Sequence, residues 1–216
     1  MIVTIDGPAG AGKSSIARRL AERLGFQFLD TGAMYRAVAL AAVRSGFGTQ
    51  QSDAIAQMAE RVTITLDGPR IWLDGEEVTS AIRTSEVSAA VHLAADNVAV
   101  RRRLVELQQQ IVGSRDTVTE GRDQGTVAFP QAECKIFLTA SAQERALRRQ
   151  AELAERGETI RFKDVLAQQC ERDERDASRP VGALLKAADA VEVLTDGLSP
   201  DEVVEQLERI VRARTG

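Results

Sequence analysis

The chain has 216 residues and a formal net charge of −4 at pH 7; 44% of its residues are hydrophobic and 28% are charged. This mixture is typical of a globular protein and excludes a disordered or collagen-like chain. The longest apolar run, residues 37–43, is far shorter than the roughly 20 residues of a membrane-spanning helix. The acidic balance also argues against a nucleic-acid-binding surface, so we expect neither membrane nor nucleic acid as a partner.

Cysteine and histidine usage excludes several kinds of site. Cys134 and Cys170 lie far apart in the sequence, which is typical of free thiols in a reducing compartment and not of a disulfide framework or a zinc site. The N-terminus shows no signal-peptide pattern, so we expect a cytoplasmic protein. His92 is the single histidine, which excludes mechanisms that need a histidine pair.

Short apolar strands alternate with helices along most of the chain. The first strand, residues 2–5, precedes a helix that carries Ile16, Leu20 and Leu24 on one face and stops at Gly25. Further strands are expected over 26–29, 117–120, 135–139 and 190–194, and further helices over 33–45, 52–60, 97–112, 141–156, 162–176 and from 200 onward. We expect Ser52 to open the second of these helices and Ser199 to cap the last. The order predicts an α/β fold, a parallel sheet covered by helices on both faces.

Residues 62–94 have a different pattern. Residues 62–66 and 70–73 alternate, and Asp67-Gly68-Pro69 and Asp74-Gly75 are turn sequences. This predicts a small antiparallel insertion on a core formed by residues 1–61 and 95–216.

The strongest motif lies between the first strand and the first helix. Its residues are Gly7, Pro8, Ala9, Gly10, Ala11, Gly12, Lys13 and Ser14, with Ser15 following. They match G-x-x-x-x-G-K-[ST], whose backbone N–H groups cradle phosphates at a helix N-terminus. Lys13 can reach the β- and γ-phosphates and the Ser14 hydroxyl can bind Mg²⁺. The alternative, a glycine-rich turn without a ligand, is disfavoured because the strand and the helix are both in place.

The remaining sequence favours a kinase for a small molecule. The base-recognition motif N-K-x-D of GTPases is absent. The chain has 24 arginines and four lysines. Codon bias explains most of this excess, but guanidinium groups also bind phosphates through two parallel hydrogen bonds.

Three further motifs make the prediction specific. They are L-D-T-G-A-M-Y-R at 29–36, E-G-R-D-Q-G-T at 120–126 and R-D-E-R-D-A-S-R at 172–179. Together with the loop and the insertion, they closely resemble the bacterial cytidylate kinase family over essentially the whole chain. The resemblance implies a P-loop kinase core, a monophosphate-binding insertion and a helical lid at about 150–168. It also implies transfer of the γ-phosphoryl group of ATP to CMP or dCMP.

The resemblance also implies which residues meet the acceptor. Thr31, Arg36 and Arg122 match residues at its phosphate, and Arg101 and Asp123 match residues at the cytosine edge. Independently, a carboxylate such as that of Asp123 suits the exocyclic amine of cytosine, which is a hydrogen-bond donor. A local ion pair between Asp123 and Arg122 is the alternative. Arg36 and Arg122 join Lys13 as the residues expected to act in catalysis.

Arg172 and Asp176 match the ribose-binding pair of the family, and Arg179 matches an arginine close to the acceptor nucleotide. Because Arg172 and Asp176 are four residues apart, an exposed helix pair is the alternative. In the lid, Arg148, Arg149 and Arg156 are candidates for contact with the phosphates of ATP.

The sequence departs from the family pattern at three places. His92 stands where a small hydroxyl residue is common, and it either contacts cytosine or packs at the edge of the insertion. Glu120 replaces an aspartate and keeps a carboxylate that could lie near Mg²⁺-bound water. Leu184 replaces a proline.

These residues predict an ATP- and Mg²⁺-dependent kinase of CMP and dCMP that is a monomer. One alternative is a P-loop kinase for another nucleoside monophosphate or for a small acceptor such as shikimate. The other is a regulatory module that binds nucleotides without transferring phosphate.

Overall fold

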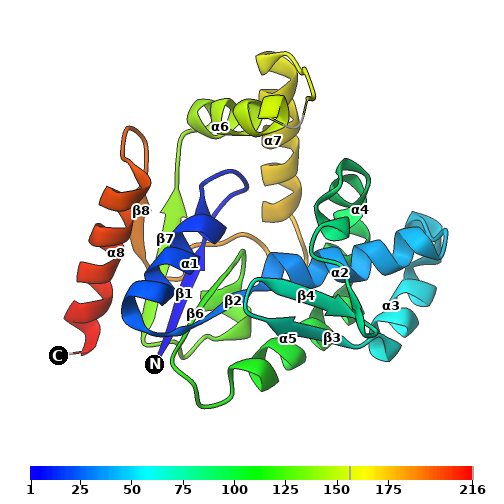
Figure 1. The fold of residues 1–216 in the computed structure, drawn as a ribbon, viewed down its shortest axis with the longest axis horizontal. Helices are drawn as coiled ribbons and strands as arrows, with labels where there is room; N and C mark the ends of the chain where they lie inside the picture. Colours follow the sequence, from blue (N-terminus) through cyan, green and yellow to red (C-terminus); the bar gives the residue numbers. More distant parts are fainter. Residues whose placement is uncertain (156, 216) are drawn as a thin grey trace. The chain divides into compact units, whose positions relative to one another are not determined.

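A computed structural model describes residues 1–155 and 157–215 of the chain. Its contacts divide the chain into two compact units (Figure 1). The first unit consists of Met1–Leu29 and Ser114–Gly216, and the second is Asp30–Gly113. The chain therefore leaves the first unit once, completes the second unit and returns.

The first unit is built on a five-stranded sheet with the order β2-β6-β1-β7-β8. Its strands are β1 (Ile2–Asp6), β2 (Gln27–Asp30), β6 (Thr117–Gly121), β7 (Cys134–Thr139) and β8 (Val191–Leu194). β1 pairs in parallel with both β6 and β7, and β7 pairs in parallel with β8. The predicted parallel sheet flanked by helices is therefore confirmed.

The helices of this unit are α1 (Lys13–Leu24), α6 (Ala142–Glu155), α7 (Phe162–Ala177) and α8 (Pro200–Thr215). α1 and α8 lie side by side against the sheet (Figure 1). Leu20 of α1 and Leu207 of α8 join Val3, Ile5 and Ile136 of the strands in one buried core. Burial of such side chains contributes about 1.5–3 kcal/mol each, so this core holds β1 in place, and β1 carries the glycine-rich loop at its end.

The helix ends test the expected caps. Gly25 ends α1 in the left-handed conformation, with φ of 69°. The Ser199 Oγ accepts a hydrogen bond from the Glu202 backbone N–H, and the Glu202 carboxylate accepts one from the Ser199 N–H, which is a capping box. Both predictions are confirmed. Ser52 is the first residue of its helix, as predicted, and its Oγ accepts a hydrogen bond from the Asn97 side chain.

The second unit combines a three-stranded antiparallel sheet with four α-helices. The strands are β3 (Ile64–Asp67), β4 (Arg70–Leu73) and β5 (Glu76–Glu77), and the helices are α2 (Thr31–Arg44), α3 (Ser52–Arg61), α4 (Ser85–Ala95) and α5 (Val98–Val112). The antiparallel meander is as predicted. Helix α4 was not predicted: it begins after Thr84, whose Oγ1 accepts a hydrogen bond from Val87 N–H, and it buries mostly small residues that give a weak periodic signal.

The second unit is wider than the expected insertion. Residues 62–94 lie within it, but so do α2, α3 and α5. The functional division into a core, an insertion at 62–94 and a lid at about 150–168 stays a prediction. In the lid region, α6 and α7 share a small core of their own, formed by Ala146, Leu153 and Val165. None of the described helices has the length and apolar character of a membrane span.

Candidate active site

The loop between β1 and α1 lies very close to the neighbouring strand β7. A Cβ at Gly7 would lie 1.9 Å from the Leu138 carbonyl oxygen, and the φ of Gly7 is +151°. Only glycine fits both constraints. The chain then turns into the N-terminus of α1, where backbone N–H groups without helical partners bind anions.

Lys13 is buried at the start of α1. Its Nζ donates a hydrogen bond to the Pro8 carbonyl oxygen at 2.7 Å. Burial, and next the positive charge of Arg122, lower the pKa of Lys13 to about 7; Arg172 lowers it further, and Glu120 opposes them. The charges of Arg122 and Arg172 thus both act on Lys13, and this concentration of positive charge favours the binding of a polyphosphate.

Ser14 and Glu120 form the part of the site that fits a magnesium ion. The Ser14 Oγ donates a hydrogen bond to Glu120 Oε1 at 2.7 Å, across 106 positions of sequence. A hydroxyl and a carboxylate are hard oxygen ligands, and Mg²⁺ in kinases uses few protein ligands besides water and phosphate oxygens. Among the described residues there is no cluster of three or more acidic, histidine or cysteine side chains that could hold a metal by itself.

Asp6, at the end of β1, organises the segment that follows Arg122. Its two carboxylate oxygens accept hydrogen bonds from the Gln124 and Gly125 backbone N–H groups at 2.8 and 2.7 Å. These residues begin a short π-helix, η3 (Gln124–Ala128). Burial raises the pKa of Asp6 to about 6, although the two hydrogen bonds oppose the shift. Local sequence patterns give no signal for this role of Asp6, because its partners lie more than 100 positions away.

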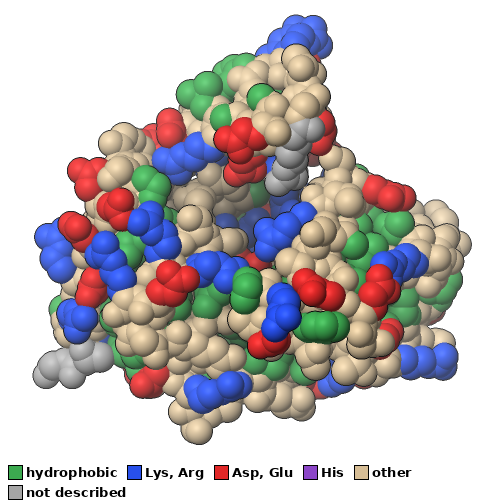
Figure 2. All heavy atoms as spheres, viewed as in Figure 1, with side chains coloured by type: hydrophobic (Ala, Val, Ile, Leu, Met, Phe, Trp, Pro, Cys, Tyr) green, Lys and Arg blue, Asp and Glu red, His purple; other side chains and the backbone are tan. Residues whose placement is uncertain are grey.

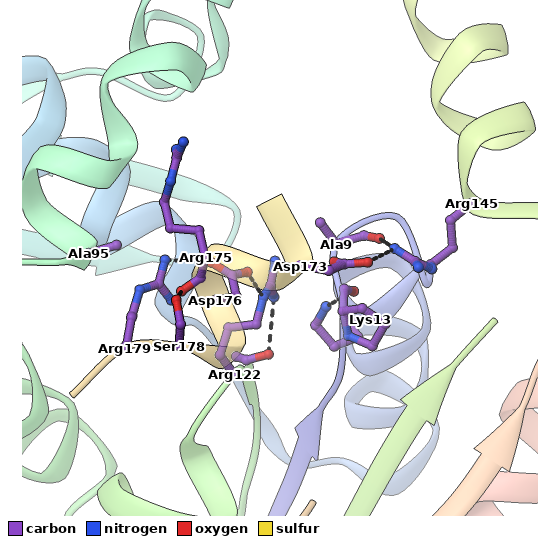
Figure 3. A network of polar contacts seen from close by, with 12 residues as sticks. Ala9, Lys13, Ala95, Arg122, Arg145, Asp173, Arg175, Asp176, Ser178 and Arg179 are labelled. Atoms are coloured by element: carbon purple, nitrogen blue, oxygen red, sulfur yellow. Dashed lines mark hydrogen bonds and ion pairs between the residues drawn. The ribbon is translucent and has the colours of Figure 1, made fainter. Parts of the chain in front are cut away.

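The Asp176 carboxylate holds two of the expected acceptor-binding arginines (Figure 3). Arg122 Nε donates to Asp176 Oδ2 at 2.8 Å, and Arg179 donates to Oδ1. Burial alone would raise the pKa of Asp176, but the charges of Arg122 and Arg179 outweigh it and hold the pKa below its usual value. The Asp176 side chain is only 4% exposed, so it belongs to a buried network and not to an exposed helix pair. Arg172 contributes to the same electrostatic environment.

Asp123 is also buried in the first unit. Its backbone carbonyl accepts hydrogen bonds from the Val127 and Ala128 N–H groups. Arg122 pairs with Asp176, and Arg122 and Arg172 both act on Lys13. The first unit therefore brings the glycine-rich loop together with the 120–126 and 172–179 motifs.

Two residues expected at the acceptor phosphate lie on α2 of the second unit. Thr31 is its first residue and is buried. The Arg36 Nη1 donates to the Ser88 Oγ at 2.8 Å and to the Ile82 carbonyl oxygen at 3.4 Å. Neutral oxygens hold the guanidinium of Arg36 in these contacts.

Arg101 and His92 are the residues of the second unit that the resemblance places near the base. Arg101 is buried on α5, donates to the Ala95 carbonyl oxygen at 2.9 Å and lies over the Tyr35 ring, 5.2 Å from its centroid. The His92 Nδ1 lies 2.7 Å from the Ala89 carbonyl oxygen on the same helix. Its contact with cytosine stays untested.

The candidate lid arginines engage local carboxylates. Arg148 pairs with Glu144 and Arg149 pairs with Glu152, both at 3.0 Å. Arg156 lies outside the described residues. Over the face shown in Figure 2, acidic and basic side chains are interspersed.

The sequence of this chain is similar to those of known kinases. The profile of the family "Cytidylate kinase" matches residues 3–213. A cytidylate kinase of Rhodopirellula baltica is 51% identical over 212 residues, which cover 98% of this chain and 93% of that protein. A cytidylate kinase of Desulfitobacterium hafniense is 47% identical over 208 residues, with 95% and 90% covered. The chain belongs to the cytidylate kinase family. The resemblance inferred from the motifs is therefore confirmed.

Solved structures support the fold of this family member. A shikimate kinase from Bacteroides thetaiotaomicron matches with a TM-score of 0.51 at 11% identity and 98% coverage of both chains. The protein TT1252 from Thermus thermophilus matches with a TM-score of 0.52 at 17% identity, covering 100% of this chain and 98% of that one. At such low identity these similarities concern the fold alone.

Proposed function

We propose that this protein transfers the γ-phosphoryl group of ATP to CMP and dCMP, producing ADP and the cytidine diphosphates. The observation that carries the proposal is the group of cations at the glycine-rich loop, where Arg122 and Arg172 lie close enough to lower the pKa of Lys13. Phosphoryl transfer needs two anionic groups held in line and their growing charge stabilised. The choice of cytidine nucleotides rests on membership of the cytidylate kinase family.

The donor site in this proposal is the segment Gly7–Ser15. Backbone N–H groups of the loop bind the phosphates, and Lys13 contacts the β- and γ-phosphoryl oxygens. Ser14 and Glu120, joined by their 2.7 Å hydrogen bond, would hold Mg²⁺. When bound, Mg²⁺ neutralises charge on the phosphate oxygens.

A second set of residues is proposed to bind the acceptor. They are Thr31, Arg36, Arg101, Arg122, Asp123, Arg172, Asp176 and Arg179. In the first unit, Asp176 orients the guanidinium groups of Arg122 and Arg179 through charge-assisted hydrogen bonds, which are stronger than neutral ones. Arg36 and Arg122 stabilise the transferring phosphoryl group together with Lys13. The lid at about 150–168 closes over ATP and excludes water that would otherwise accept the phosphoryl group.

We also propose that the protein is a monomer and that it works in the cytoplasm. Cys134 is a buried free thiol and Cys170 an exposed one, which supports a reducing compartment.

Steady-state kinetics with CMP, dCMP, UMP and AMP as acceptors test the substrate assignment. We expect CMP and dCMP to have the highest kcat/KM, with one ADP formed for each acceptor phosphorylated. A preference for AMP, or for UMP alone, would overturn the assignment to cytidine nucleotides. Tight CMP binding without turnover would instead indicate a regulatory nucleotide-binding module.

Substitution of Arg36 tests the phosphate contact. Loss of a charge-assisted hydrogen bond worth about 1.5–3 kcal/mol predicts that Arg36→Ala lowers kcat/KM for CMP by about 10- to 100-fold. Arg44→Ala is the matched control, because Arg44 lies on the same helix and pairs with Glu76 at the surface. An unchanged kcat/KM in Arg36→Ala would place the acceptor phosphate elsewhere.

A further inference from the structure

Arg145 of α6 joins the glycine-rich loop to two other elements (Figure 3). Its Nε donates to the Ala140 carbonyl oxygen after β7, and its Nη1 donates to the Ala9 carbonyl oxygen of the loop, both at 3.0 Å. The same Nη1 forms an ion pair with Asp173 Oδ2 of α7 at 2.6 Å. The residue is 6% exposed. The buried guanidinium thus binds three partners, and none of these contacts involves a residue already assigned to the acceptor.

The contact with Ala9 determines how the next peptide N–H points. In a planar trans peptide the C=O and N–H groups point in opposite directions. Because the Ala9 carbonyl points at Arg145, the N–H of Gly10 points away from it. The loop is also close to α6 and α7 at Gly10, where a Cβ would lie 3.2 Å from Arg145 Cβ and 2.7 Å from Gln169 Nε2. Rotation of the Ala9–Gly10 peptide would break the Arg145 hydrogen bond inside this crowded region.

We propose that Arg145 is a positioning residue for ATP: it fixes the Ala9–Gly10 peptide so that the phosphate loop is preorganised for a polyphosphate. This inference rests on the proposed ATP site. Backbone N–H groups that are already ordered bind a polyphosphate more tightly, because ordering the loop on binding would make the binding free energy less favourable. Arg145 itself acts through the loop backbone and not by touching the nucleotide.

Asp173 orients the guanidinium in this arrangement. One of its oxygens binds Arg145, while the other, Oδ1, is buried without a hydrogen-bond partner among the described residues. Arg145 is therefore the ion-pair partner of this carboxylate, whose side chain is 22% exposed, and removal of the arginine alone leaves a poorly compensated, partly buried charge. For this reason the test includes a double variant that removes both charges.

The experiment measures the dissociation constants of ATP and of inorganic tripolyphosphate by calorimetry on the full chain without acceptor. Arg145→Lys keeps the charge but loses the forked geometry, and we expect both dissociation constants to rise about tenfold. Arg145→Met/Asp173→Leu should raise both by about 30-fold or more. The KM for CMP should stay within about threefold of the parent value, so that binding of the phosphoryl donor is weakened and use of the acceptor is not. Arg212→Ala, which breaks an exposed pair on α8, is the control and should change neither constant.

Three results would overturn the inference. Parental affinities in a folded double variant would show that the loop is ordered without Arg145. A loss of ATP affinity with unchanged tripolyphosphate affinity would mean that Arg145 acts on the nucleoside. If the variants bound ATP more weakly, had an equally raised KM for CMP and unfolded at a lower temperature, Arg145 would contribute to stability only. A parent protein that binds ATP but does not phosphorylate CMP would refute the proposed function and leave this comparison intact.

Discussion

Asp6 shows how a single buried carboxylate can organise a site and still cost stability. Its two backbone hydrogen bonds satisfy both oxygens and hold the start of η3. Burial nevertheless raises its pKa to about 6, so near neutral pH the folded protein carries a charge that its surroundings disfavour. The same carboxylate keeps the turn after Arg122 and Asp123 in place.

The raised pKa predicts a pH dependence of stability. The ordinary aspartate pKa of 3.8 applies to the unfolded chain, so between pH 3.8 and about 6 the folded state binds more protons. The contribution of Asp6 is therefore most favourable below pH 3.8 and is lost as the pH rises through the folded pKa of about 6. The loss amounts to about 3 kcal/mol at most. In Asp6→Asn this dependence is absent.

Urea unfolding at pH 4, 5, 6 and 7 measures the effect. We expect the free energy of unfolding of the parent, relative to Asp6→Asn, to fall over this range. The change with pH is compared and not the absolute level, because an amide in place of the carboxylate loses one of the two backbone hydrogen bonds. Parallel pH profiles for the two proteins would contradict the raised pKa.

At the scale of an element, η3 packs closely against the strands of the first unit. A Cβ at Gly125 would lie 2.9 Å from Thr4 Oγ1, 3.2 Å from Lys135 Cδ and 3.4 Å from Asp6 Oδ2. The threonine is buried in β1 and cannot move away easily. The lysine is also held, because its Nζ donates hydrogen bonds to the Pro130 carbonyl oxygen and to the Asp189 carboxylate. The absence of a side chain at Gly125 therefore lets η3 lie where Asp6 can hold it.

Gly125→Ala tests this packing. Overpacking of a buried site costs about 1–3 kcal/mol, and displacement of η3 should also lower kcat/KM, because η3 directly follows Arg122 and Asp123. Gly48→Ala is the matched control: a Cβ there meets only the Gln51 Oε1 at 3.6 Å. Thermal and urea unfolding together with CMP kinetics measure both effects. Equal stability and activity in the two variants would show that η3 tolerates the methyl group.

At the scale of the whole molecule, the residues proposed to bind ATP and several of those proposed to bind the acceptor belong to different units. The donor segment Gly7–Ser15 belongs to the first unit, and Thr31, Arg36 and Arg101 belong to the second. Each unit has its own sheet and its own helices, so ligands can stabilise them separately.

Amide hydrogen exchange with each substrate alone tests this separation. We expect ATP to slow exchange in residues 7–15 and CMP to slow it in residues 31–36, because a ligand protects the segment whose opening it opposes. Strands β3 and β4 serve as the internal control, because we expect ATP to leave their amide exchange unchanged. Protection of residues 31–36 by ATP alone, without protection of the loop, would contradict the assignment of the donor site.

Much of this fold follows from local sequence patterns. The glycine-rich loop, the stop at Gly25, the cap at Ser199 and the β3–β4 meander all depend on residues close in the sequence, and each was predicted. Helix α4 was not, because its small residues give little periodicity. Ser52 opens its helix as predicted, but the hydrogen bond that its side chain accepts from Asn97, 45 positions away, has no signal in the local sequence.

The sequence by itself determined the family, the fold class and the phosphate loop, because ordered motifs and neighbouring residues carry that information. Only the tertiary structure decided which charged groups meet. Arg122 pairs with Asp176 across 54 positions, Asp6 holds Gln124 across 118, and Arg145 holds Ala9 across 136. Such contacts form when separate elements pack, and burial then decides their strength by removing the water that would otherwise screen them.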